Sequence, residues 1–172
     1  MIKALVLSFL LPFAFTAAAE TLTGKATVVD GDTVRIGDLA VNLYGIDAPE
    51  LGQICTDQKG KQFNCGHASM RRLFLYIGGD PLDCKVKSRG TDGVLNATCR
   101  VISYFIHTEN GATRGEKFDV ALEMVLTGHA FAHPDTADYA VAEKKARHDL
   151  KGFWKGTFSL PWEWRRISAK HE

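Results

Sequence analysis

The sequence predicts an α+β fold in which helices pack against a small closed β-barrel of five strands. Short β-rich runs alternate with turn residues in the first third of the chain. A helical segment then separates these runs from a further hairpin, and the last third has apolar residues at helical spacing. The chain has 172 residues, of which 45% are hydrophobic and 24% charged. This excludes a disordered chain, a collagen-like repeat and a coiled coil, and it fits one folded domain.

The strands of the predicted barrel begin near residue 22. Residues 25–29, 33–36 and 39–44 are rich in β-forming side chains. Gly37 and Asp38 form a two-residue hairpin loop between the second and third runs. In the third run apolar and polar residues alternate, so Asn42 and Tyr44 share the face opposite the apolar one. A later hairpin turns at residues 90–93, and its second strand is expected to continue through residue 106.

Helices are expected in three segments. Residues 66–77 place Met70, Leu73, Phe74 and Ile77 on one face, and two glycines end the helix. Asp119 caps a helix over residues 120–126. Apolar residues at helical spacing between residues 139 and 153, including Leu150 and Phe153, predict a third helix that is buried on one side. A short aromatic and basic tail follows from about residue 155.

The first residues have the pattern of an export signal. A basic start at Lys3 precedes a run of almost wholly apolar residues up to position 15, and small residues follow. We expect cleavage after Ala19, which leaves a domain over residues 20–172 in the periplasm or outside the cell. No other apolar run approaches the length of a membrane span. The expected mature protein is a monomer without a membrane partner.

Export also indicates that the cysteines form disulfides. Outside the cytoplasm thiols tend to form disulfides, and the chain has Cys55, Cys65, Cys84 and Cys99. A hairpin that turns at residues 90–93 places Cys84 directly opposite Cys99, within disulfide reach. Cys55 then pairs with Cys65. The alternative is a zinc site made of these last two and His67, but the spacing matches no common zinc motif.

Three carboxylates stand at strand ends or turns on either side of the first hairpin. They are Asp32, Asp47 and Glu50. Like charges converge only where a cation or a proton holds them, and a hard ion such as Ca²⁺ or Mg²⁺ prefers oxygen ligands. The alternative is that the two aspartates are turn formers that bond the local backbone.

Two sequence blocks contain these carboxylates: D-G-D-T-V at residues 30–34 and G-I-D-A-P-E at residues 45–50. With them the chain resembles the staphylococcal nuclease-like (thermonuclease) family. The resemblance continues through residues 128–130, 139–147 and 152–154, and through Pro161, Trp164 and Arg165. It implies an OB-fold barrel with three helices. It also implies calcium-dependent cleavage of phosphodiester bonds, with single-stranded DNA or RNA as the substrate.

The resemblance assigns roles to one residue of the first block and three of the second. Asp32 and Asp47 correspond to the calcium-binding carboxylates, and the backbone carbonyl of Ala48 is a further ligand. Glu50 corresponds to the acid that orients or deprotonates the attacking water. These roles agree with general chemistry, in which a cation offsets phosphate charge and a nearby carboxylate accepts the proton of water.

The chain departs from the family at the two arginines that clamp the phosphate, where it has Asn42 and Asn96. Losing one such donor typically slows a reaction by ~10²–10³, so the expected nuclease is weak. Arg35 lies diagonal to the first asparagine, and Lys87 lies opposite the second with Arg100 following on the same face. We hypothesise that Arg35 and Lys87 supply the missing charge and that Arg100 contributes to substrate binding. The alternative is that they are ordinary solvated strand residues.

Two functions therefore remain open from the sequence. One is an exported nuclease of low or altered activity. The other is a non-catalytic module that binds a nucleic acid, a glycan or a protein, with exopolysaccharide production as a context that some exported relatives suggest. The carboxylates favour the enzyme. The two asparagines favour the binding module, and so does the neutral net charge expected once Lys3 is removed with the export signal.

Overall fold

The computed structural model of the chain describes residues 20–102, 106–108, 111–113 and 118–170. The predicted export signal lies outside these residues, as does part of the stretch through which the last hairpin strand was expected to continue. Within the described residues that strand ends at Val101. No helix in this part of the chain is long and apolar enough to cross a membrane.

The barrel consists of five strands. They are β1 (Thr21–Val28), β2 (Thr33–Ile36), β3 (Leu39–Leu43), β7 (Pro81–Arg89) and β8 (Leu95–Val101). Neighbours in the sheet follow the order β8-β3-β2-β1-β7, and a further pairing of β7 with β8 closes the barrel. The β3–β8 pairing is parallel, and the other pairings are antiparallel. The predicted α+β fold with a closed five-stranded barrel is thus confirmed.

Short strands extend or flank the barrel. They are β4 (Ile46–Asp47), β5 (Ile54–Thr56), β6 (Gln62–Asn64), β9 (Ile106–Thr108), β10 (Gly111–Thr113), β11 (Phe118–Asp119) and β12 (Phe131–Ala132). β11 adds to the barrel sheet beside β8, and the others form two-stranded pairs. The pair that matters for the site is β4 with β12, which places Asp47 opposite Phe131.

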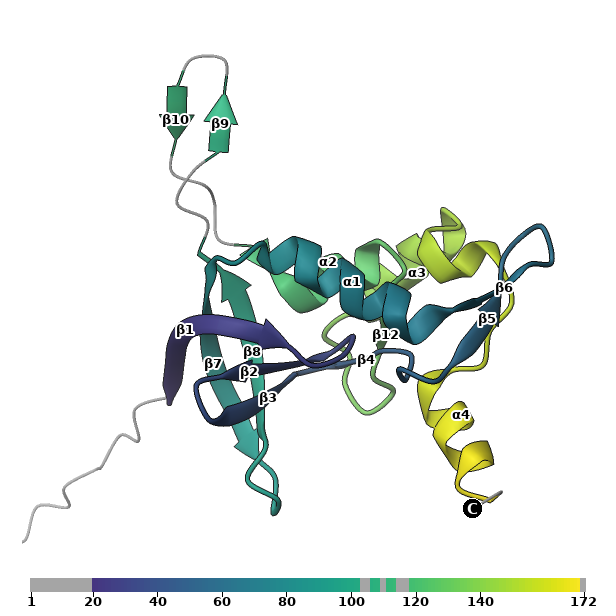
Figure 1. The fold of residues 1–172 in the computed structure, drawn as a ribbon, viewed down its shortest axis with the longest axis horizontal. Coiled ribbons are helices and arrows are strands. Elements are labelled where there is room, and N and C mark those ends of the chain that lie inside the picture. Colours follow the sequence, from purple (N-terminus) through teal and green to yellow (C-terminus); the bar gives the residue numbers. More distant parts are fainter. Residues whose placement is uncertain (1–19, 103–105, 109–110, 114–117, 171–172) are drawn as a thin grey trace, which may run out of the picture.

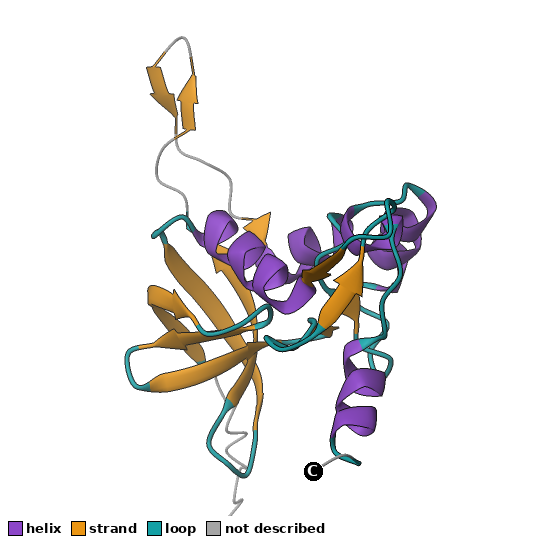
Figure 2. Ribbon diagram, turned by 45° about the vertical axis from the view of Figure 1, so that its right-hand side comes forward, coloured by secondary structure: helices purple, strands orange, loops and turns teal. Residues whose placement is uncertain are grey.

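The described residues form five helical segments, of which the first two cover one end of the barrel (Figures 1 and 2). They are α1 (Cys65–Ile77), α2 (Val120–Leu126), α3 (Ala140–His148), the 3₁₀ turn η1 (Gly152–Lys155) and α4 (Pro161–Ser168). α1 contacts β1 and α2, while α2 contacts β8 and α3. Side-chain caps start the first two helices: Asn64 accepts from the His67 N–H, and Asp119 accepts from the Leu122 N–H.

The core lies between the barrel interior and the inner faces of α1 and α2. Alternate residues of the strands point inward, as the period of two requires, and α1 and α2 each add a buried stripe. The largest contributors are Val34, Val41, Leu43, Leu73, Leu82, Leu95, Val101 and Met124. Each such side chain is worth about 1.5–3 kcal/mol of transfer free energy when fully buried.

The helical region differs from the prediction in three respects. The described residues contain four α-helices rather than three, because the expected tail forms α4. The third helix ends at His148, and Leu150, at φ +50°, is 57% exposed. The left-handed Leu150 ends the helix, and the Lys151 N–H bonds back to the Ala146 carbonyl at 2.9 Å. Gly152 then packs against the backbone of Gly128, where no side chain fits. On α1, Phe74 is 61% exposed instead of buried.

Both predicted disulfides are present. Cys84 and Cys99 are direct partners in the β7–β8 register with Cα atoms 4.0 Å apart, and Cys55 is joined to Cys65 with Cα atoms 5.6 Å apart. The zinc alternative is therefore wrong, because both of its thiols are consumed in the second bond. That bond ties the β5–β6 hairpin to the start of α1, next to the loop that forms the candidate site.

Candidate functional site

One cavity of about 640 Å³ opens where β2 and β3 meet the loop after β4 and the helix α4. Its lining includes six residues to which the sequence assigns a role: Asp32, Asn42, Asp47, Ala48, Glu50 and Asn96. The charged groups that line it are five acids and one arginine: Asp30, Asp32, Asp47, Glu50, Asp135 and Arg165. The fold therefore gathers the predicted carboxylates at one place, with more negative than positive charge around it.

The D-G-D turn is shaped by a close approach to its neighbours. The Asp30 carboxylate accepts hydrogen bonds from the backbone N–H groups of Asp32 (3.0 Å) and Thr33 (2.7 Å). Gly31 is buried, and a Cβ there would overlap the Ser69 side chain and lie 2.6 Å from Ala48 Cβ. Glycine between the two aspartates thus lets the turn press against the loop that carries Ala48 and Glu50.

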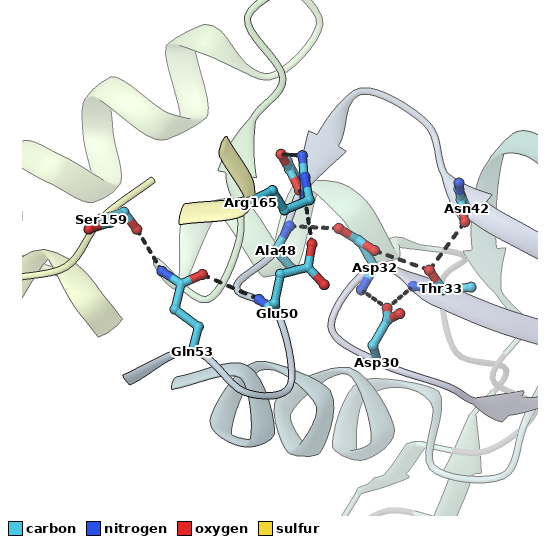
Figure 3. Close-up of polar contacts among 10 residues, drawn as sticks. Asp30, Asp32, Thr33, Asn42, Ala48, Glu50, Gln53, Ser159 and Arg165 are labelled. Carbon is cyan, nitrogen blue, oxygen red and sulfur yellow. Dashed lines mark hydrogen bonds and ion pairs between the residues drawn. The ribbon is translucent and has the colours of Figure 1, made fainter. Parts of the chain in front are cut away.

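Asp32 is linked directly to that loop. Its Oδ2 accepts a 2.6 Å hydrogen bond from the Ala48 N–H (Figure 3). The Thr33 hydroxyl lies 3.2 Å from Asp32 Oδ1 and 3.1 Å from Asn42 Oδ1, and it can donate to one of them. Burial, followed by the charge of Asp30, raises the pKa of Asp32 well above its usual range, although the Ala48 bond opposes this. Among the described residues, the charges that act most strongly on Asp32 are thus those of other acids.

Asp47 and Glu50, in contrast, share a positive partner. Arg165 of α4 binds both oxygens of Asp47, with Nη1–Oδ1 at 2.9 Å and Nη2–Oδ2 at 2.7 Å. The same Nη1 lies 2.6 Å from Oε1 of Glu50. Asp47 is only 5% exposed. The bonds to Asp47, and then to Glu50, raise the pKa of Arg165 further above its usual range. A buried carboxylate requires such a partner, because an unpaired buried charge costs several kcal/mol.

Gln53 fixes the loop on which Glu50 lies. This side chain is fully buried, and its Oε1 accepts from the Glu50 N–H at 3.3 Å. Its Nε2 donates to the Ser159 carbonyl at 2.7 Å, so the segment before α4 is tied to the loop (Figure 3). One amide therefore holds in place both the acid and the segment that carries Arg165.

Three cationic residues that the sequence singles out do not line the cavity. The Arg35 guanidinium donates to the Asp38 carbonyl at 3.3 Å, at the turn between β2 and β3. Arg100 is paired in register with Asp83 and Asp119 at the other end of β8. Lys87 lies closer, with its ammonium 5.8 Å from the ring centre of Tyr44, which lines the cavity. Only Lys87 thus stands at the rim.

The expected position of Lys87 opposite Asn96 is wrong. The register runs regularly to Val86 opposite Ala97, and an irregularity then places Ser88 opposite Asn96. The extra residue of such a bulge is Lys87, so the strand twists and the serine faces the asparagine. Asn96 Nδ2 donates to Ser88 Oγ at 3.2 Å. A hydroxyl rather than an ammonium is therefore the cross-strand partner.

The types of donor present suit calcium, but Arg165 already engages one of the carboxylates. Carboxylate and carbonyl oxygens of Asp32, Asp47 and Ala48 are the hard ligands that Ca²⁺ takes. Yet within the part of the chain that the structure describes, no three acidic, histidine or cysteine side chains are gathered as a metal site requires. Arg165 engages both oxygens of Asp47. These residues fit the ion only after Arg165 has moved.

Sequence reasoning did not place Arg165 or Gln53 in the site. Arg165 belongs to the segment that resembles the nuclease family, but no pattern links it to an aspartate 118 positions earlier. Gln53 is a single polar residue in an irregular stretch, and nothing local indicates that it is buried. Both act through contacts that only the folded chain creates.

Comparison with known proteins gives one informative relative. No family model matches the chain. The succinoglycan biosynthesis protein ExoI of Rhizobium meliloti (strain 1021) is 31% identical over 154 residues, which cover 87% of this chain and 73% of that protein. The chain belongs to the ExoI family. For this ExoI-family protein, the similarity extends well beyond the two short acidic blocks and includes most of the barrel and helices.

The close approach at Gly31 generates a prediction. Gly31→Ala places a methyl group against Ala48 and Ser69, and overpacking of this kind lowers the free energy of unfolding by about 1–3 kcal/mol. Gly52→Ala is the matched control, since its methyl would lie at an ordinary 3.9 Å from the Trp164 ring. Urea denaturation of both variants measures the effect, and equal stability of the two would contradict the packing account.

Proposed function

We propose that this ExoI-family protein is a calcium-dependent hydrolase of phosphodiester bonds, with low activity on single-stranded DNA or RNA. The observation that carries the proposal is the convergence of Asp32, Asp47 and Glu50 on one cavity. A barrel that only binds a ligand does not need a carboxylate such as Glu50 at the mouth of such a site. Its resemblance to the thermonuclease family supports the same chemistry.

The residues have distinct roles in this proposal. Asp32, Asp47 and the Ala48 carbonyl hold the ion, which when bound offsets the charge of the phosphate and makes water easier to deprotonate. Glu50 accepts the proton of the attacking water. Arg165 engages Oε1 of Glu50, so the departure of Arg165 that the ion requires also frees this carboxylate to act as the base. The side chain of Glu50 is 35% exposed, so water reaches it.

Low activity follows from the charges around the cavity. An incoming phosphodiester meets five carboxyl groups and one guanidinium. Asn42 and Asn96 can donate hydrogen bonds to phosphate oxygens, but they carry no charge. Because a missing preorganised donor typically costs ~10²–10³ in rate, we expect turnover far below that of a nuclease with two clamping arginines.

Glu50→Gln tests the proposal. We expect calcium-dependent cleavage of a single-stranded DNA oligonucleotide by the wild type, and a loss of about 10²–10⁴-fold in the variant, which lacks the base. A chelator should abolish cleavage. Glu20→Gln is the control, because Glu20 pairs with Arg89 on the surface and does not line the cavity. Cleavage that survives the chelator, or its absence at high enzyme concentration, would overturn the proposal.

Lys87 is the better-placed candidate for the missing positive charge. We expect Lys87→Ala to reduce cleavage by about 1.5- to 5-fold, the size of an exposed electrostatic contact. Arg35→Ala should change the rate less, since Arg35 is held at the hairpin turn. Initial rates at low salt measure both effects. Identical rates for wild type and Lys87→Ala would show that no such compensation exists.

A glycan-binding module is the second candidate. The relative is a succinoglycan biosynthesis protein, and the cavity has amides, hydroxyls and the ring of Tyr44 besides its acids. Such groups can hydrogen-bond to sugar hydroxyls and stack on a sugar ring. Calorimetry with purified exopolysaccharide tests this candidate. Binding that needs no calcium and is lost in Asn96→Ala, with no cleavage of DNA, would favour the module over the hydrolase.

A further inference from the structure

We propose that Arg165 is a built-in competitor of divalent cations. Its guanidinium occupies both carboxylate oxygens of Asp47, one of the proposed ligands of the ion, so a docked Arg165 and an occupied metal site exclude each other. This inference rests on the calcium site of the proposed function, but it does not require hydrolysis. It makes Arg165 the residue that determines how readily the site accepts a metal.

The contacts of Arg165 are those of a counter-ion rather than of a surface residue. Two parallel bonds reach both oxygens of Asp47, at 2.9 and 2.7 Å, and a third reaches Glu50 at 2.6 Å. Asp47 is buried, so solvent screens these charges little. A cation that binds an Asp47 oxygen comes within a few ångströms of this guanidinium, and the two positive charges repel. The metal therefore binds well only when Arg165 withdraws.

The part of α4 around Arg165 offers little resistance to such a withdrawal. Among the residues of α4 only Pro161 is buried, and the side chain of Arg165 is 46% exposed. Figure 1 shows α4 extending away from the helices that cover the barrel. At the start of the helix, Trp162 packs against the apolar cluster that contains Phe131 and Phe153. The docked position of the rest of α4 depends mainly on the ion pairs of Arg165.

The segment before α4 is anchored independently. Gln53 Nε2 holds the Ser159 carbonyl at 2.7 Å, and backbone bonds of 2.9 Å pair Thr56 with Thr157 in both directions. These contacts lie outside the ion-pair cluster and persist when Arg165 leaves. Release of α4 therefore does not require the domain to unfold. The effect is reciprocal. If the docking of α4 lowers the affinity for the ion, the bound ion lowers the stability of the docked α4 by the same free energy.

Calcium binding to the full mature chain tests the inference, with affinity measured by calorimetry. We expect Arg165→Ala to bind Ca²⁺ about 10- to 100-fold more tightly than the wild type, which corresponds to loss of a charged bidentate contact. Arg166→Ala is the matched control: it removes the same charge from the next residue, for which the structure shows no ion pair, and should bind like the wild type. Arg165→Lys keeps the positive charge but cannot form the two parallel bonds, so its calcium affinity should lie between those of the wild type and Arg165→Ala.

Hydrogen exchange gives a second readout that does not depend on activity. In the wild type, Ca²⁺ should speed amide exchange in α4 and leave α1 unchanged. Equal calcium affinity of wild type and Arg165→Ala, with exchange of α4 insensitive to Ca²⁺, would overturn the inference and leave the calcium site standing. Failure of every variant to bind Ca²⁺, with circular dichroism showing all of them folded, would overturn both the inference and the calcium site.

Discussion

The buried carboxylate of Asp47 is the constraint on which the site depends. It lies on a two-residue strand opposite Phe131 and is 5% exposed. A charge in such a place must be paired, and the chain pairs it with Arg165, far away in sequence. This pairing draws Arg165 of α4 to the site, where it also binds Glu50, and it reduces the negative charge that remains for a ligand or an ion.

The two acidic blocks have a structural role besides their chemistry. Gly31 allows the first block to pack directly on Ala48 of the second, and the Ala48 N–H then binds Asp32. Asp47 is drawn instead toward α4. The blocks therefore hold two carboxylates in different electrostatic states: Asp32 has acidic neighbours, whereas Asp47 has an arginine. A ligand that enters the cavity encounters both.

The features that the sequence predicts well depend on local contacts. Gly37 marks a hairpin, Asp119 caps a helix, and the turn at residues 90–93 aligns Cys84 with Cys99. The position of Lys87 was missed because a bulge shifts the register without any residue that signals it. Leu150 was expected to be buried because its spacing is helical, yet the chain turns to bring Gly152 against Gly128.

Only part of the candidate site could be predicted, because some of its contacts join segments that are distant in the sequence. The motifs of the family resemblance identify Asp32, Asp47 and Glu50, and the barrel brings them together. The counter-ion comes from a helix at the other end of the chain, and sequence spacing carries no information on contacts between such distant segments. Electrostatic pairing of this kind becomes visible only when burial is known, because exposure decides whether a carboxylate needs a partner.

A double-mutant cycle between Asp47 and Arg165 tests the central claim most directly. The free energy of unfolding is measured in chelator for the wild type, Asp47→Asn, Arg165→Ala and the double variant. If Arg165 is the counter-ion of the buried carboxylate, the two substitutions are coupled by about 1–3 kcal/mol, and the double variant is little less stable than Asp47→Asn. Effects that add to within about 0.5 kcal/mol would contradict the account.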